Sequence, residues 1–286
     1  MPISQKRPSI SYKVFQTLSL DVIIGVLAIA LFSIQLLNID LQAIWLLILV
    51  LATWSFYTID HLIDGIKSQG KSTIYRHLFH FNYKLTLSIL SVFSGIAALT
   101  LSLILLDQKI IIFGIAMACI VLVYFSVLTL SGHKRSFLLQ KELIIALVYI
   151  IGIWMAPLIW AEKKPETFTI IIIIVLILLA WAEGIMASWF DYENDFKEGH
   201  SSFTVLFGKQ NTRRFLIILH ILLFIIIKIS VLFVTTELQF AAIIILALMN
   251  ISLLLILLYP KTFSKNNNYR IFGEMVFWLP FPIILF

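Results

Sequence analysis

The chain has 286 residues, of which 61% are apolar and 13% are charged, and its mean hydropathy is +1.03. A soluble domain carries about 25% charged residues, so the soluble globular, disordered and fibrous classes are excluded. The single cysteine, Cys119, excludes an intramolecular disulfide and a cysteine-based metal centre. The basic residues that give the net charge of +6 lie in short segments between apolar stretches. We therefore expect no nucleic-acid partner. We expect one integral membrane domain over residues 1–286.

Apolar stretches long enough to span a bilayer follow one another along the chain, since about 20 such residues cross the hydrocarbon core. Eight are clear, at residues 15–37, 41–59, 85–106, 110–132, 143–161, 167–190, 215–236 and 238–260. A ninth, from residue 271 to Phe286, is shorter and contains Glu274, Pro280 and Pro282. The predicted fold class is all-α: a polytopic helical bundle of about nine transmembrane helices around a central cavity.

The basic residues of the connecting loops predict how the chain is oriented in the membrane. If nine spans alternate in direction, 17 of the 21 Lys and Arg residues lie on the side of the N-terminus. Three, Lys109, Lys163 and Lys164, lie on the other side. Cytoplasmic loops are enriched in Lys and Arg, so we expect a cytoplasmic N-terminus. The long polar loops 60–84 and 191–214 share that side, and loops often carry function.

Two pairs of aspartates stand at the cytoplasmic ends of the second and sixth predicted spans. The first pair is Asp60 and Asp64, and the second pair is Asp191 and Asp195. A spacing of i, i+4 places both carboxylates on one face of a continuing helix. Because both spans run in the same direction, the two pairs can face each other at one depth. Mg²⁺ binds carboxylates together with substrate phosphates, so this pattern favours a magnesium-bridged diphosphate over solvated acids at helix ends.

The segment after the second pair resembles the second aspartate motif of the UbiA superfamily of intramembrane prenyltransferases. The residues that fall in register with that motif are Asp191, Asp195, Gly199, Thr204, Gly208 and Lys209. The first motif departs from the family pattern. When its last two aspartates are placed on Asp60 and Asp64, Phe56 and Tyr57 stand where an Asn and a further Asp are usual. One potential metal ligand is therefore missing.

The resemblance implies an enzyme that transfers a polyprenyl group from a polyprenyl diphosphate to an acceptor, commonly an aromatic quinone precursor. It implies a multi-pass protein of the cell (inner) membrane with its active face towards the cytoplasm and with Mg²⁺ as cofactor. The implied catalytic residues and metal ligands are Asp60, Asp64, Asp191 and Asp195. The candidate substrate-binding residues are Arg76, Lys134, Lys197 and Tyr57. Metal ions and Lys or Arg side chains would neutralise the leaving diphosphate, and ring faces could stabilise an allylic cation.

Other interpretations stay open at this stage. A catalytically inactive or divergent UbiA-like membrane protein would fail to bind Mg²⁺ and a prenyl diphosphate. A transporter would favour paired spans broken by Gly or Pro near the bilayer centre, which the sequence does not display. A di-iron oxidase would need many histidine ligands, but only His77 and His80 are closely spaced among six histidines. Glu183 is an intramembrane charge two turns before Asp191, where it could face the same cavity.

Overall fold

The computed structural model describes residues 10–285 except for residue 69 and residues 71–74, 131–140 and 199–201. All regular structure in the described part is helical. The long helices are α2 (Leu20–Leu37), α3 (Ala43–Lys67), α5 (Lys84–Leu105), α6 (Gln108–Leu130), α7 (Lys141–Trp160), α8 (Thr167–Glu198), α10 (Lys209–Ser230) and α11 (Glu237–Leu258). The short α-helices are α1 (Ile10–Thr17), α4 (Tyr75–Asn82), α9 (Phe203–Phe207), α12 (Pro260–Phe263) and α13 (Asn268–Val276). The described residues also form three 3₁₀ helices: η2 (Val231–Phe233), η3 (Lys265–Asn267) and η4 (Phe281–Leu285).

Within these described residues, seven helices are long and apolar enough to cross a membrane: α2, α3, α5, α7, α8, α10 together with η2, and α11. Helix α6 is apolar as well, over the shorter stretch Gln108–Tyr124. The all-helical, multi-pass membrane architecture predicted from composition is therefore confirmed. In the described part of the chain there are thus seven candidate spans, where nine were expected, and α6 is an eighth long apolar helix.

Two predicted spans differ from the helices that form. The first is divided, because Ser19 adopts a left-handed backbone conformation (φ 56°) between α1 and α2. The ninth is not one continuous helix: α13 ends at Val276, and only the 3₁₀ helix η4 follows. Pro280 and Pro282 stand in this stretch, and proline removes a backbone donor and clashes with the preceding helical turn.

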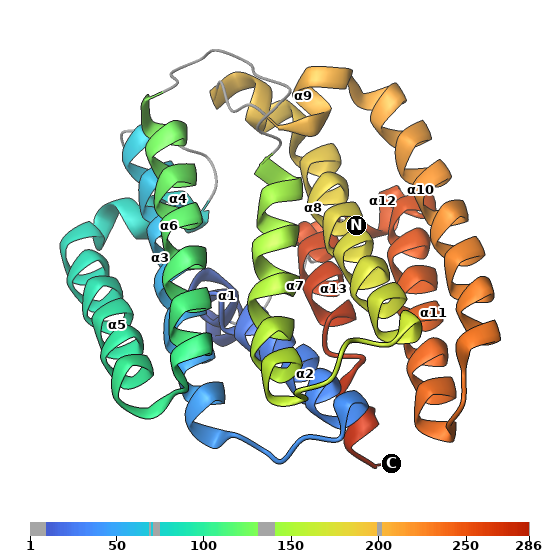
Figure 1. The fold of residues 1–286 in the computed structure, drawn as a ribbon. Helices are drawn as coiled ribbons and strands as arrows, with labels where there is room; N and C mark the ends of the chain where they lie inside the picture. The colour runs from blue at the N-terminus through green and yellow to red at the C-terminus, as the bar shows by residue number, and fades with distance from the viewer. Residues whose placement is uncertain (1–9, 69, 71–74, 131–140, 199–201, 286) are drawn as a thin grey trace.

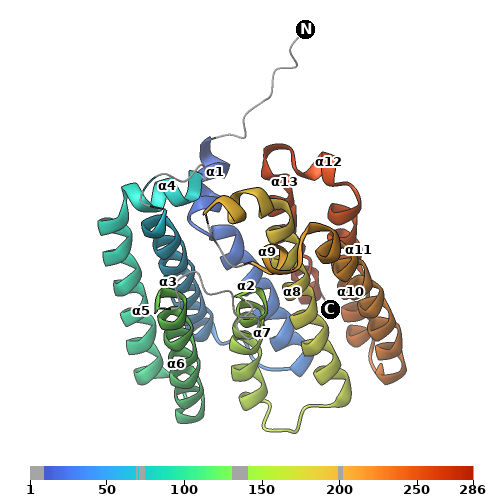
Figure 2. The same ribbon diagram turned by 90° about the horizontal axis from the view of Figure 1, so that it is seen from above.

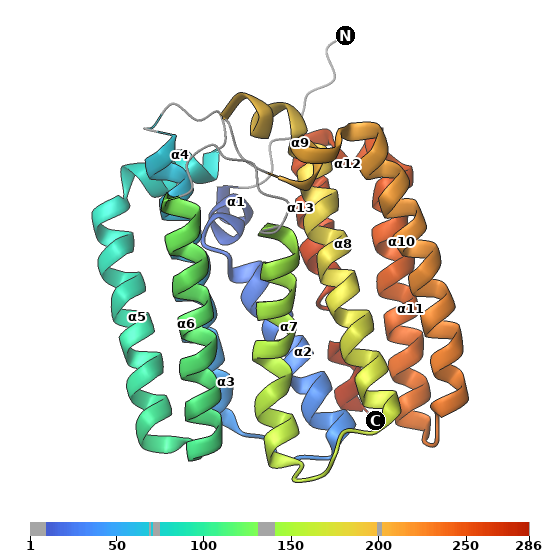
Figure 3. The same cartoon turned by 45° about the horizontal axis from the view of Figure 1, so that its top comes forward.

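The helices form a bundle in which α2, α7 and α8 occupy the middle. Figures 1 and 2 both place α5 and α6 on one side of these helices and α10 and α11 on the other. The short helices α4, α9 and α12 lie together at one end of the bundle (Figure 3). That end is the one at which α3 and α8 finish.

Helix α8 contributes the centre of the apolar core. Ile172, Val175, Leu176 and Leu179 are fully buried there. By contrast, Phe93 on α5 is among many large apolar side chains exposed on the outer helices, as expected for surfaces that face lipid.

Small residues bring α3 and α5 close together. The Ser55 hydroxyl donates a hydrogen bond to the Ser91 carbonyl (2.9 Å), and the Ser94 hydroxyl donates to the Leu51 carbonyl (2.9 Å). A Cβ at Gly95 would lie 3.0 Å from the Ser55 hydroxyl. Such small-residue contacts are typical of helix pairs inside membranes, and they fix the helix that carries the first aspartate pair.

Candidate active site

Both aspartate pairs lie on helices that continue beyond the predicted spans. Helix α3 runs through Asp60 and Asp64, and α8 runs through Asp191 and Asp195. The expected arrangement of each pair, one turn apart on a single helix, is therefore present. Each pair lies in the last turns of its helix, and α3 and α8 end at the side of the bundle that carries α4 and α9 (Figure 3). Asp60 and Asp191 are each only 7% exposed, so their charges need partners.

Lys141, the first residue of α7, is the partner of the first pair. Its ammonium lies 3.2 Å from Oδ1 and 3.3 Å from Oδ2 of Asp60, and 3.4 Å from Oδ2 of Asp64. One cation thus contacts three oxygens of the two carboxylates. Two like charges one turn apart repel, and Lys141 offsets that repulsion.

The second pair is held from α13 at the C-terminal part of the chain. The Arg270 guanidinium donates to Oδ2 of Asp191, and the Tyr269 hydroxyl donates to Oδ1 of the same carboxylate. Arg270 also donates to the Tyr269 oxygen (3.3 Å), and the Tyr269 ring stacks on Phe190 with centroids 4.4 Å apart. Burial raises the pKa of Tyr269 to about 12, so the phenol remains protonated and acts as a donor.

Arg76 on α4 connects the two pairs electrostatically. Burial lowers the pKa of Arg76, the nearby charge of Arg270 lowers it further, and the charges of Asp191, Asp64 and Asp60 oppose this shift. One guanidinium therefore acts on carboxylates of both helices. Of the two described basic residues that were proposed from sequence to contact a diphosphate, Arg76 and Lys197, Arg76 is the one that lies near the aspartates.

The residue after Lys141 reaches the chain segment that follows the second pair. Glu142 is nine-tenths buried, and its Oε1 accepts a hydrogen bond from the Phe203 backbone N–H at the start of α9 (2.8 Å). Its Oε2 is buried without a partner among the described residues. Gly184 on α8 makes room for Glu142, since a Cβ there would lie 3.3 Å from the Glu142 Cβ. The first turn of α7 therefore contacts both aspartate regions.

Further polar groups lie inward from the aspartates. Glu183 on α8 faces α13, since a Cβ at Gly273 would lie 3.0 Å from its Oε1. Tyr57 interacts electrostatically with Glu274 and Glu183, and its ring lies edge-on to His61 (centroids 6.3 Å apart). Tyr57 is half-buried and lies one turn before Asp60 on α3, and its role towards the substrate stays a prediction.

One further predicted residue that the structure describes, Lys197, is not drawn into this group. Lys197 is exposed near the end of α8, and Lys134 falls outside the described residues. His77 and His80 are buried on α4. Across the described ranges, no three or more His, Cys, Asp or Glu side chains are grouped so that they could hold a metal ion.

Four residues of the site were not predicted as such from the sequence: Lys141, Glu142, Tyr269 and Arg270. In the sequence Lys141 and Arg270 are two of the basic loop residues, and nothing in their local sequence indicates which carboxylate they meet. The signal that could have found Lys141 and Glu142 is their position. Charged residues at the first turn of an apolar span stand at the depth where the other spans end in aspartates.

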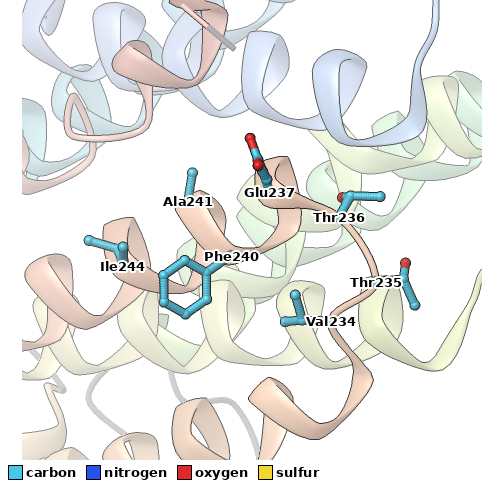
Figure 4. Close-up of a pocket in the computed structure, with 7 residues that line it drawn as sticks. All are labelled: Val234, Thr235, Thr236, Glu237, Phe240, Ala241 and Ile244. Carbon is cyan, nitrogen blue, oxygen red and sulfur yellow. The ribbon is translucent and has the colours of Figure 1, made fainter.

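A shallow hollow of about 640 Å³ lies at the opposite end of the bundle. It is formed at the turn between α10 and α11 (Figure 4). Its lining residues are Val234, Thr235, Thr236, Glu237, Phe240, Ala241 and Ile244. Glu237 is the only charged residue in this lining, so the hollow does not offer the paired acids and bases found at the aspartate end.

Comparison with known proteins adds a family assignment over most of the chain. The sequence model described as the UbiA prenyltransferase family matches residues 22–279. The matched range contains both aspartate pairs together with Lys141, Tyr269 and Arg270. No curated protein and no solved structure matches the chain.

Proposed function

The chain belongs to the UbiA prenyltransferase family, whose members transfer prenyl groups, and from this premise we propose that it joins a polyprenyl chain to an acceptor within the membrane. The donor in this proposal is a polyprenyl diphosphate, and the acceptor is an aromatic quinone precursor. The reaction takes place at the aspartate end of the bundle. We place that end at the cytoplasmic face of the cell membrane because the basic loops lie on the same side.

One observation carries the proposal. Two helices that run in the same direction end in aspartate pairs, and Arg76 acts electrostatically on carboxylates of both. Lys141 and Arg270 add two further cations in direct contact with the pairs. The aspartates hold several cationic side chains close together, and such a cluster can bind a highly charged anion. The diphosphate is the anionic part of the donor.

The residues of the second pair suit the magnesium ion on which the family generally depends. Asp191 and Asp195 offer carboxylate oxygens one turn apart, and Mg²⁺ is commonly held by one or two carboxylates plus substrate phosphates. We propose these two residues as its ligands. We propose that the first pair, Asp60 and Asp64, also binds cations, and the Lys141 ammonium contacts both of its carboxylates. When bound, the metal ion would supply charge that stabilises the departing diphosphate.

The protein's own side chains have three tasks in this reaction. Arg76, with Lys134 as a further candidate and the exposed Lys197 as a weaker one, would bind the diphosphate as the carbon–oxygen bond breaks and its electron pair leaves with the diphosphate. The ring of Tyr57 would face the resulting allylic cation. The apolar interior excludes water, so the cation forms its new carbon–carbon bond with the acceptor, which then loses a proton.

The test is a transfer assay with purified protein in lipid nanodiscs. Labelled polyprenyl diphosphates of several lengths are supplied with Mg²⁺ and a panel of aromatic acceptors, and lipid products are identified by mass spectrometry. We expect a prenylated acceptor and release of diphosphate that chelation of Mg²⁺ abolishes. The Asp191→Asn variant is the matched negative control. Folded wild-type protein that neither binds nor cleaves any prenyl diphosphate would contradict the proposal and favour an inactive relative.

A further inference from the structure

We propose that a group of exposed bases at one end of the α10–α11 helix pair binds the phosphate groups of anionic phospholipids. This group, called the basic rim below, consists of Lys209, Arg213 and Arg214 in the first turns of α10, Lys261 in α12 and Lys265 in η3. The inference is independent of the proposed function, because the bound lipid is neither donor nor acceptor of the prenyl group.

The basic rim lies at one end of two neighbouring helices. The chain turns back between Ser230 and Glu237, so α10 begins at the end where α11 finishes. The His220 ring on α10 is hydrogen-bonded to the Asn250 side chain on α11 (2.7 Å). Arg213 stands two turns before His220 on the same side of α10, so it lies on the side that faces α11. Figures 1 and 2 both place this helix pair at the edge of the bundle, where lipid surrounds the protein.

The charges of the basic rim are not neutralised within the described part of the chain. The sequence has no Asp or Glu in residues 199–236 or 238–273, and none of the five rim side chains forms an ion pair with another described residue. By contrast, Lys141 and Arg270 contact the carboxylates of the aspartate pairs. The bases of α10 and α12 therefore remain available to an anion from outside the protein.

An exposed apolar stripe continues from the basic rim along α10. Ile218, Ile221 and Ile225 follow Arg214 at spacings of four, three and four residues, which places all four side chains on one face of the helix. The three isoleucines are 63%, 54% and 51% exposed, and α10 is a candidate membrane span. A molecule with an anionic head and an acyl chain fits this face, since its phosphate can meet Arg214 while its chain lies along the isoleucines.

The size of the basic rim also favours the membrane's own anionic lipids. Groups of four to eight Lys and Arg residues next to a transmembrane helix attract anionic headgroups, and each base adds to the attraction. The basic rim has five such residues at the ends of two spans. A free phosphate or diphosphate would use the bases but leave the apolar stripe without a function.

Lys209 connects the basic rim to the helix that carries the second aspartate pair. Its ammonium lies over the rings of Trp189 and Tyr192, 5.5 and 5.9 Å from their centroids, and its carbonyl accepts a hydrogen bond from Trp189 Nε1 (2.9 Å). Trp189 and Tyr192 stand on either side of Asp191 in the sequence of α8. A phospholipid on the basic rim would therefore stabilise the first turn of α10 against the part of α8 that carries Asp191.

The test measures lipid binding to the purified full-length chain in detergent by native mass spectrometry, with phosphatidylglycerol as the anionic probe and phosphatidylcholine of the same acyl chains as the neutral one. We expect phosphatidylglycerol to bind about tenfold more tightly or better, because several bases act on its phosphate. Equal affinity for the two lipids would overturn the inference.

A variant of the basic rim and a matched control locate the bound lipid. The rim variant carries Lys209→Gln, Arg213→Gln and Arg214→Gln. The control removes the same charge from three exposed bases at the other end of the bundle, with Lys109→Gln, Lys163→Gln and Lys164→Gln. We expect the preference for phosphatidylglycerol to fall by about tenfold or more in the rim variant and to persist in the control. Unchanged preference in the folded rim variant, or equal losses in both proteins, would overturn the inference.

The bases after α11 provide a second variant that leaves α10 intact. Lys261→Gln combined with Lys265→Gln should lower the preference for phosphatidylglycerol by about threefold or more, and it also serves where the rim variant does not fold. Full preference in this folded double variant would overturn the assignment of α12 and η3 to the basic rim.

Two further measurements distinguish a membrane phospholipid from other anions. Inorganic diphosphate should not displace phosphatidylglycerol, and displacement would show that the basic rim belongs to the diphosphate site instead. Hydrogen exchange of residues 209–214 should be slower in nanodiscs of phosphatidylglycerol than in nanodiscs of phosphatidylcholine. Residues 231–237, at the turn between α10 and α11, are the internal control and should exchange equally in both. Equal exchange of residues 209–214 in the two lipids would overturn the inference.

Discussion

The two aspartate pairs have the same spacing on equivalent helices, but the chain partners them in different ways. The first pair shares one lysine, which stands at the start of α7 and contacts both carboxylates. The second pair is met by an arginine and a tyrosine from α13, and both of these bond to Asp191. Equal spacing in the sequence therefore does not imply equal chemistry. What distinguishes the pairs is the cation that the rest of the fold delivers to them.

The start of α7 shows how the two regions are connected. Lys141 turns to the first pair, and Glu142, the next residue, accepts the Phe203 N–H in the segment after the second pair. Helix α7 packs between α2 and α8 in the middle of the bundle (Figure 2). A displacement of this one helical turn would disturb both aspartate regions together.

The largest expected effect comes from removing a carboxylate of the second pair. Asp191→Asn leaves Arg270 and Tyr269 without their charged acceptor and removes a proposed metal ligand. Because even partners of metal ligands are worth about 10–100-fold, we expect kcat/KM for prenyl transfer to fall by more than about 100-fold. Asp107→Asn is the matched control, since Asp107 accepts a hydrogen bond from Trp160 (2.9 Å) at the other end of the bundle. Comparable losses in both variants would contradict the assignment.

Arg76 tests whether the two pairs work as one site. Arg76 acts electrostatically on both aspartate pairs, so Arg76→Gln should weaken the binding of the diphosphate at each of them. We expect kcat/KM to fall by about 100-fold, the loss typical of removing one preorganised group that stabilises developing charge. Arg76→Lys should recover part of this loss by restoring the charge without the planar guanidinium. The measurement is steady-state kinetics, with folding checked by thermal unfolding. Normal kinetics in folded Arg76→Gln protein would show that Arg76 does not make one site of the two pairs.

Glu142 tests the connection through α7 with a smaller effect. Glu142→Ala leaves the buried Phe203 N–H without its acceptor, which costs about 1–3 kcal/mol, and should lower kcat by about tenfold. Glu142→Gln retains a carbonyl oxygen at that position and should recover most of the activity. Hydrogen exchange of residues 202–208 provides a second measurement. Faster exchange there in Glu142→Ala, but not in Glu142→Gln, is expected. Unchanged exchange in both variants would argue against a positioning role.

The fold was predictable wherever apolar length alone decides the structure. Eight of the predicted spans correspond to long helices, because a run of about 20 apolar residues has to satisfy its backbone internally in lipid. The errors lie where local backbone chemistry intervenes. Ser19 adopts a left-handed conformation inside the first predicted span, and the prolines at 280 and 282 interrupt the ninth. Helices α3 and α8 also continue through the polar aspartate segments, which hydropathy assigns to loops.

The acids of the site could be predicted, whereas most of their cations could not. Two aspartates at i, i+4 form a local pattern that the sequence displays directly. The partner of Asp60 lies 81 residues away and that of Asp191 lies 79 residues away. Their meeting depends on how α7 and α13 pack against α3 and α8. Arg76 was one of three loop bases predicted to contact a diphosphate, and the structure places it on α4, which packs against α3.

The smallest effect is expected for Lys197, which distinguishes bases of the site from bases of the surface. Lys197 follows the second pair by two residues, but its side chain is exposed. Exposed charges contribute only about 0–1 kcal/mol, so Lys197→Gln should change kcat/KM by less than about threefold if Lys197 stays in solvent during the reaction. The same assay at low and high salt should give equal ratios of variant to wild type. A tenfold loss that disappears at high salt would show that Lys197 contacts the diphosphate during the reaction. The second pair would then have two cationic side chains beside it, Arg270 and Lys197, whereas the first pair has Lys141.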